Sequence, residues 1–228
     1  MIMDNPSPAS SFVKKMPVRL GLLWFFIHTT IWISAVKFIP GSSFVPYKDL
    51  GSISTPWIRQ FVLPLCLVAL FQFVAAKKLR LMERSFKEAK PSVKNSLWIW
   101  PALMLGAVIY LVSTGLSAGG VSFYAGLVLT CLLVGLTEEM SFRGVLLVLF
   151  RESKKKEAFA LWLSSILFGL FHLPNILIGG EVSATIRQVF ATCVMGMVFY
   201  ALRRRSGSLV WCILLHAVYD MAVLASAG

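Results

Sequence analysis

The apolar residues of this chain are gathered into long, nearly uninterrupted blocks, and this arrangement limits the folds that the chain can adopt. A helix needs about 20 mainly apolar residues to cross the hydrocarbon core of a bilayer. Inside that core every backbone polar group must be bonded within the segment, which favours helices. The sequence therefore predicts an all-α, polytopic transmembrane helix bundle of about seven membrane segments. They are expected at about 20–39, 57–76, 97–115, 122–150, 158–177, 184–202 and 208–226.

The composition agrees with a membrane protein. Hydrophobic residues make up 57% of the 228 residues and charged residues only 14%, whereas charged residues are about a quarter of an ordinary soluble domain. The net charge of +12 would favour nucleic acid as the partner of a soluble protein. Here the basic runs lie between apolar blocks and lack interleaved stacking aromatics. We therefore expect contact with the lipid bilayer and its anionic headgroups, and no nucleic-acid partner.

The basic residues predict how the chain is oriented in the membrane. Four runs in alternate loops hold 17 of the 22 basic residues, and of the intervening loops only the first has one, Lys48. Because basic loops stay cytoplasmic, the N-terminus is expected inside. The four runs are Lys14, Lys15 and Arg19; Lys77, Lys78, Arg80, Arg84, Lys87, Lys90 and Lys94; Arg151, Lys154, Lys155 and Lys156; and Arg203, Arg204 and Arg205.

Three regions follow from this layout. We expect a cytoplasmic N-terminal tail at 1–19, three membrane segments at 20–115 and a helical core at 122–228. The charged loop 77–96 is expected to be a solvated helix or linker that faces the headgroups. The first block could be a cleaved signal peptide, but its apolar run is long and no clear small-x-small cleavage site follows. These features favour a retained helix.

Six ionisable residues lie inside the apolar blocks, where each costs at least about 2.5–3.5 kcal/mol at a helix centre. Such residues are retained when they face one another or a water-filled cavity. Counted at about 1.5 Å per helical residue from the basic ends, four of them from three segments reach a similar depth. The fourth block either continues as one long helix through its charges or breaks there. The six are Glu138, Glu139, Arg143, His172, His216 and Asp220.

These side chains are suited to hydrolysis. Glu139 and Arg143 share a helix face and can pair, as can His216 and Asp220. A carboxylate and an imidazole together can deprotonate a water, and a second imidazole can stabilise an oxyanion. A zinc ion is the alternative, because two histidines and a glutamate match catalytic zinc ligation. Its candidate ligands are Glu138, His172 and His216, although the sequence contains no HExxH motif.

Three motifs in this order resemble one family. The stretch from Glu138 to Arg143 fits EExxxR, Phe168 to His172 fits FxxxH, and His216 to Asp220 fits Hxxx(N/D). Over about residues 124–224 the chain resembles the CPBP intramembrane proteases, which include the CAAX prenyl proteases of the Rce type and the bacterial Abi proteins. The first three segments contribute no motif. The resemblance implies an intramembrane endopeptidase that acts on a peptide or membrane-protein substrate, and it favours a bacterial-type plasma (inner) membrane as the location.

The resemblance also implies a role for each residue. Glu138 corresponds to the general base that shares the attacking water with His172, without a required cofactor. Glu139 and Arg143 correspond to a supporting ion pair. His216 and Asp220 correspond to the pair that stabilises the oxyanion. Asp220 is Asn in some relatives, and an ionised Asp cannot donate a hydrogen bond, so Asp220 is either protonated or orients His216. Phe168 is expected to set the rotamer of His172.

Other interpretations of the same residues remain open. Glu139 and Arg143 could form a purely structural pair, because buried pairs often only neutralise one another. His28, in the first segment, has no evident partner and is interpreted as structural. The polar cluster could also serve as the proton relay of a transporter or lie in a non-catalytic membrane binding protein. Transporters usually have paired halves, and no internal symmetry is evident here, which favours the enzyme.

Overall fold

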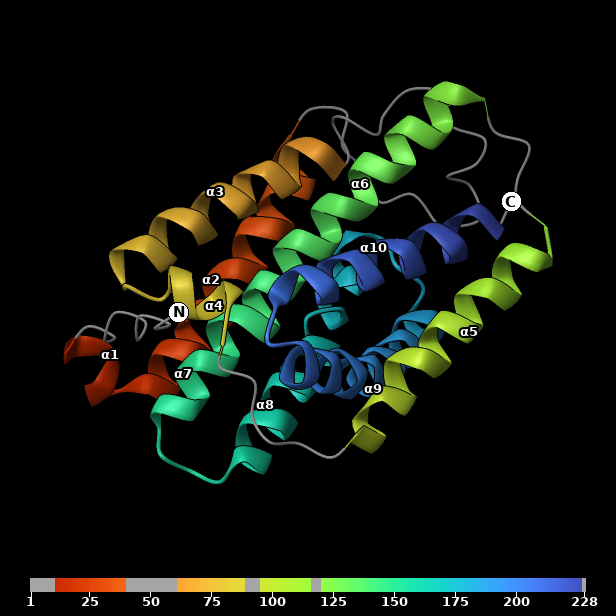
Figure 1. The fold of residues 1–228 in the computed structure, drawn as a ribbon. Coiled ribbons are helices and arrows are strands. Elements are labelled where there is room, and N and C mark those ends of the chain that lie inside the picture. The colour runs from red at the N-terminus through yellow and green to blue at the C-terminus, as the bar shows by residue number, and fades with distance from the viewer. Residues whose placement is uncertain (1–10, 40–60, 89–94, 116–119, 227–228) are drawn as a thin grey trace.

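The computed structural model describes residues 11–39, 61–88, 95–115 and 120–226, and within them the chain is built from helices (Figure 1). The single β-type pairing in these ranges is an isolated bridge between Lys87 and Ser208. The all-α fold class is therefore confirmed. The α-helices are α1 (Ser11–Lys15), α2 (Pro17–Phe38), α3 (Leu63–Lys78), α4 (Met82–Phe86), α5 (Ile99–Ser113), α6 (Val121–Glu139), α7 (Leu147–Glu152), α8 (Glu157–Leu170), α9 (Val182–Ser206) and α10 (Leu209–Ser226).

Every expected membrane segment contains a helix, and together these helices make the membrane bundle. Four helical stretches are long and apolar enough to cross a bilayer, and two shorter apolar helices accompany them. The count of seven spans and the inside position of the N-terminus stay predictions. Residues 57–60, Lys48, Lys90 and Lys94 lie outside the described residues. The four long stretches are Pro17–Phe38, Phe123–Glu152, Glu157–Ile178 and Val182–Ser206, and the shorter ones are Ile99–Ser113 and Leu209–Ala225.

The fourth block does not break at its charges. It runs without interruption through α6, a π-helical segment η4 (Met140–Leu146) and α7. All seven residues of η4 are buried. A π-helical turn widens the helix and re-aims the side chains around it, and such turns are frequent at functional sites. The charged residues therefore lie at the junction of α6 and η4, in the middle of one long helix.

Close approach of helix backbones positions α10 against α6 and α9 against α8. A Cβ atom on Gly135 of α6 would lie 2.7 Å from the carbonyl oxygen of Ile213 in α10. A Cβ atom on Gly169 of α8 would lie 2.6 Å from the carbonyl oxygen of Val189 in α9. Small residues at such contacts allow membrane helices to pack tightly. Both glycines lie one turn from an ionisable residue, so these contacts also fix how far apart the helices that carry the ionisable residues lie.

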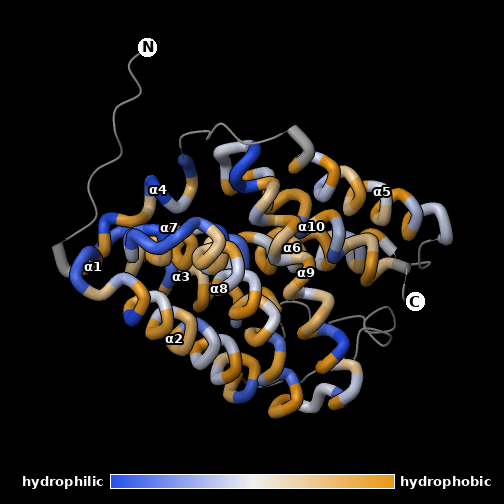
Figure 2. Tube along the Cα trace, turned by 90° about the horizontal axis from the view of Figure 1, so that it is seen from below, coloured by the Kyte–Doolittle hydropathy of each residue, from blue (hydrophilic) through white to orange (hydrophobic). Residues whose placement is uncertain are grey.

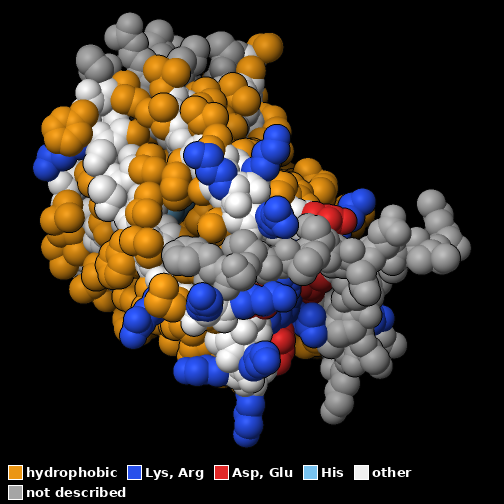
Figure 3. Space-filling view, turned by 90° about the vertical axis from the view of Figure 1, so that its left-hand side faces the viewer, with side chains coloured by type: hydrophobic (Ala, Val, Ile, Leu, Met, Phe, Trp, Pro, Cys, Tyr) orange, Lys and Arg blue, Asp and Glu red, His pale blue; other side chains and the backbone are white. Residues whose placement is uncertain are grey.

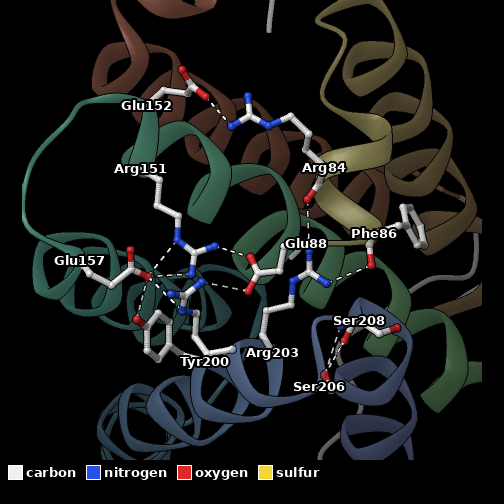
Figure 4. A network of polar contacts seen from close by, with 11 residues as sticks. Arg84, Phe86, Glu88, Arg151, Glu152, Glu157, Tyr200, Arg203, Ser206 and Ser208 are labelled. Atoms are coloured by element: carbon white, nitrogen blue, oxygen red, sulfur yellow. Dashed lines mark hydrogen bonds and ion pairs between the residues drawn. The ribbon is translucent and has the colours of Figure 1, made fainter. Parts of the chain in front are cut away.

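The basic loops meet at one end of the bundle. Figure 3 shows lysine and arginine side chains gathered there, and Figure 2 shows hydrophilic residues at α1 and α4. Arg204 Nη1 lies 3.3 Å from Glu88 Oε1. Arg151 Nη2 lies 2.7 Å from Glu157 Oε1 (Figure 4). Arg151 also pairs with Glu88. Three loops expected on the same side of the membrane are thus linked to one another.

The 77–96 loop packs into the bundle over part of its length, and the expectation of a solvated segment is wrong there. Leu81 and Ser85 are fully buried. Arg203 of α9 is also fully buried, and it donates to the carbonyl oxygen of Phe86 at 2.9 Å and to that of Arg84 at 3.1 Å. The guanidinium group thereby satisfies backbone carbonyls of α4, which a solvated helix would leave to water.

Candidate active site

A cavity of about 600 Å3 opens among α2, α3, α6, α9, α10, the end of α8 and the segment that follows α8. Four of the ionisable residues selected from the sequence line it, which confirms that they converge. Apolar side chains make up much of the remaining wall, among them Leu65 and Phe171. The four are Glu138, His172, His216 and Asp220.

Glu139 lies next to the cavity residue Glu138 but is fully buried. Its Oε1 atom accepts a hydrogen bond from Arg143 Nη1 at 3.2 Å, which confirms the expected ion pair. The same oxygen lies 2.9 Å from His216 Nδ1. Because an ionised carboxylate can only accept, the imidazole donates here. The sequence analysis paired His216 with Asp220 alone and missed this second carboxylate.

His216 turns its other nitrogen toward two carboxylates of the cavity. Its Nε2 atom lies 3.4 Å from Asp220 Oδ2 and 3.8 Å from Glu138 Oε2. The expected contact of His216 with Asp220 is therefore present. The ring of Phe199 stacks on the imidazole with centroids 4.9 Å apart and an interplanar angle of 13°. A carboxylate on each side and an aromatic ring on one face hold the imidazole in place.

Arg143 contacts aromatic rings as well as Glu139. Its guanidinium carbon lies 4.0 Å from the ring centroid of Phe168 and 5.1 Å from that of Phe199. Cation–π attraction is strongest where the cation is desolvated, and Arg143 is 1% exposed. The ring of Phe168 thus supports the cation of the ion pair, a role that the sequence analysis did not assign to it.

His172 lies just beyond α8, in the turn before the 3₁₀ segment η5 (Leu173–Ile178). The α-helix ends at Leu170, short of the end of the expected membrane segment at residue 177. His172 Nδ1 donates to the carbonyl oxygen of Phe168 at 3.0 Å, because a carbonyl oxygen can only accept. In the neutral imidazole Nε2 therefore keeps its lone pair. The backbone of Phe168 thus orients His172, and its ring lies edge-on 5.5 Å from the imidazole. That packing of this ring sets the rotamer of His172 stays a prediction.

The ligand arrangement needed for zinc is not found in the described part of the chain. No three His, Cys, Asp or Glu side chains there are placed so that they could hold one metal ion. Zinc in a catalytic site needs three protein ligands within about 2.3 Å of the ion. The candidate ligands Glu138, His172 and His216 share the cavity without forming such a group.

The expectation that His28 has no partner is wrong. Its Nδ1 atom lies 3.0 Å from Gln72 Nε2 and 3.1 Å from Ser141 Oγ, and the residue lines the cavity. Gln72 is in α3 and Ser141 is in η4, so the network joins the N-terminal helices to the segment that carries the glutamates. A sequence signal existed: Gln72 is a polar residue inside an apolar block, and such residues seek partners.

Fold and cavity together define an integral membrane helix bundle with carboxylates and imidazoles enclosed among its helices. The family model described as type II CAAX prenyl endopeptidase Rce1-like matches residues 120–222. This part of the chain is therefore similar to that family, in agreement with the CPBP resemblance. The family implies a protease of the CAAX type acting in a membrane. Comparisons with curated proteins and with solved structures gave no match. The helices α2, α3 and α5 lie outside the matched residues.

Proposed function

We propose that this protein is an intramembrane endopeptidase that hydrolyses a peptide bond with a water activated by Glu138 and His172. The observation that carries the proposal is the shared cavity, which two imidazoles and two carboxylates enter from three helical segments. Glu138 Oε2 has no hydrogen-bond partner among the described residues. Both this oxygen and the lone pair of His172 Nε2 can accept a hydrogen bond, and in the proposed mechanism they accept from the same water.

The proposed reaction needs one general base and one oxyanion donor. Glu138 takes a proton from the water as the oxygen attacks the scissile carbonyl carbon. The same proton then passes to the leaving amine as the carbon–nitrogen bond breaks. General acid–base catalysis of this kind typically contributes about 10²–10⁴-fold in rate.

His216, with a proton on each ring nitrogen, is the proposed oxyanion donor through Nε2–H. Asp220 acts as an acceptor that orients the imidazole, which fits an ionised Asp at a position where some relatives have Asn. Glu139 holds the opposite nitrogen, and Arg143 balances the charge of Glu139. Removal of one oxyanion donor typically costs about 10²–10³-fold in turnover.

The proposed substrate is a peptide or membrane-protein segment that reaches the cavity from the bilayer. The family description names CAAX prenyl substrates, and processing of a bacteriocin or leader peptide is the second candidate. The apolar wall, which includes Trp32, Val68 and Leu224, supports an apolar peptide or lipid-modified chain.

A quenched fluorescent peptide with a farnesylated CAAX terminus is a suitable probe for the purified protein. Glu138→Gln should lower cleavage by at least about 10²-fold while the protein still inserts and keeps its melting temperature. Glu83→Gln is the matched control, because Glu83 is exposed on α4 and remote from the cavity. Cleavage by Glu138→Gln at the wild-type rate would remove Glu138 from the mechanism.

If the probe is not cut, comparative proteomics of cells with wild-type and Glu138→Gln protein would reveal other substrates through peptide termini that change.

A further inference from the structure

Helix α2 brings a third imidazole to the cavity, from a part of the chain outside the family match. His28 is 1% exposed and lines the same cavity as the proposed catalytic residues. The chain contains three histidines, so all of its imidazoles lie at this cavity. His28 is therefore the imidazole that an N-terminal helix contributes to the cavity.

The hydrogen bonds around Nδ1 of His28 fix the position of the ring proton. Gln72 Nε2 lies 2.7 Å from the carbonyl oxygen of Thr137, which can only accept, so this atom of Gln72 is the amide nitrogen. Its second N–H is donated either to His28 Nδ1, 3.0 Å away, or to Ser141 Oγ, 2.9 Å away. In the first case Nδ1 is an acceptor, and the proton of the neutral imidazole is on Nε2.

Ser141 supports the same assignment. Its hydroxyl oxygen accepts from Trp24 Nε1 at 3.0 Å and lies 2.9 Å from Gln72 Nε2. In the second case two donors are directed at this oxygen, so the serine directs its own proton to His28 Nδ1, 3.1 Å away, and Nδ1 is again an acceptor. Two side chains, Gln72 of α3 and Ser141 of η4, thus hold the ring with Nε2–H on the opposite side from the network.

The Nε2–H group has no hydrogen-bond partner among the described residues. The aromatic rings next to the imidazole are those of Phe171, with centroids 4.8 Å apart, and Phe142, at 6.0 Å. Neither side chain carries an oxygen or nitrogen that could accept. Buried donors are almost always paired with protein, water or ligand, and His28 is one of the residues that line the cavity.

We propose that His28 Nε2–H donates a hydrogen bond to a carbonyl oxygen of the peptide bound in the cavity. This inference rests on the proposed endopeptidase function and adds a substrate-binding residue to it. A buried donor without a partner among the described residues selects a hydrogen-bond acceptor, and the peptide carbonyl is the acceptor that every peptide substrate carries. His28 therefore binds and orients the peptide, and the chemical step belongs to the residues on α6, α10 and the turn after α8.

Kinetics of three variants test this role with the farnesylated probe. His28→Phe removes the donor and should raise KM about tenfold, the change expected for one hydrogen bond, with kcat within about twofold. His28→Gln offers an amide N–H and should restore most of the affinity. Thr29→Ala is the matched control: Thr29 is the next buried residue of α2, bonds to the carbonyl of Phe25 and is absent from the cavity wall. Its KM should stay at the wild-type value. A fall in kcat at unchanged KM in His28→Phe would overturn the proposal.

Imidazole 15N NMR separates this inference from the protease proposal. Histidine-labelled protein gives three imidazole signals, and the His28→Gln variant assigns one of them. That signal should show Nε2 protonated and Nδ1 unprotonated, and it should shift when the probe is added to Glu138→Gln protein. Cleavage by the wild type with an unmoved His28 signal would overturn the inference and leave the protease standing. A shift without any cleavage by the wild type would retain the binding role and reject the protease. A proton on Nδ1 would overturn the inference directly.

Discussion

Nδ1 of His216 and Oε1 of Glu139 lie 2.9 Å apart, and that oxygen also accepts from Arg143 at 3.2 Å. One carboxylate oxygen thereby joins α10 to the junction of α6 and η4. The pair of Glu139 and Arg143, which could have been purely structural, is in contact with a residue of the cavity. The carboxylate of Glu139 that balances the charge of Arg143 therefore also orients the imidazole of His216.

Glu139→Gln should damage both stability and activity. The substitution leaves the buried guanidinium of Arg143 without a counter-charge, and breaking a buried pair in this way costs about 3–5 kcal/mol. Thermal unfolding in detergent and cleavage of the farnesylated probe would measure the two effects. The control is Glu152→Gln, because Glu152 pairs with Arg84 at a partly exposed position, where a pair contributes about 0–1 kcal/mol. Equal melting temperatures for the two variants would contradict the assigned role.

Gly135→Ala should separate α6 from α10. The added Cβ would lie 2.7 Å from the carbonyl oxygen of Ile213, so the helices must move apart and the contact between Glu139 and His216 must lengthen. A misplacement of about 1 Å can lower a rate by about 10²-fold. Gly106→Ala is the matched control, because a Cβ there meets nothing within 4 Å. If Gly135→Ala cleaves the probe as fast as Gly106→Ala, the spacing of these helices does not limit the reaction.

Much of the fold and of the site follows from local features of the sequence. The apolar blocks predict the helices because bilayer thickness sets their length, and the depth of each ionisable residue follows from its distance to a basic loop. The contact of Glu139 with His216 was missed because it depends on how α6 and α10 are rotated about their axes. Spacing along one helix does not determine that rotation.

The N-terminal half was harder to interpret because its polar residues are isolated in the sequence. His28 and Gln72 are 44 residues apart, and neither belongs to a pattern that marks a site. The packing of α4 was missed for a related reason. Its charges predict solvation, but Arg203, more than a hundred residues later, supplies the donors that allow it to be buried.

Asp220→Asn should retain cleavage within about tenfold of the wild type. The amide oxygen of Asn can still accept from His216 Nε2, which lies 3.4 Å from Asp220 Oδ2. Asp220→Ala removes the acceptor and should lower kcat further, because the imidazole loses one of its two orienting carboxylates. The values of kcat for both variants, measured at saturating probe, show whether an acceptor at position 220 is needed. Equal rates for Asn and Ala would show that Asp220 does not orient His216.

A strong chelator should leave cleavage by the purified protein unchanged. The described residues offer no group of three His, Cys, Asp or Glu side chains that could hold a metal ion, and the proposed base is a carboxylate. Metal content measured before and after chelation accompanies the assay. Activity that falls on chelation and returns with added zinc would reverse the preference and make Glu138, His172 and His216 the ligands to test.

Arg203→Met should release α4 without changing the chemistry. The methionine fills similar apolar space, but it leaves the carbonyl oxygens of Phe86 and Arg84 without donors, and hydrogen bonds from a charged group contribute about 1.5–3 kcal/mol each. Trypsin should then cut more rapidly at Lys87, which is exposed beside α4. The melting temperature should fall, whereas KM for the probe should not change, because Arg203 does not line the cavity.

The matched control for this variant is Lys77→Met, which removes an exposed charge from the same end of the bundle. It should unfold at the wild-type temperature, since a solvated lysine there holds no other element in place. The comparison separates the loss of the buried hydrogen bonds from a general loss of positive charge. Trypsin sensitivity that rises equally in both variants would mean that charge, and not the bonds from Arg203, keeps α4 against η4.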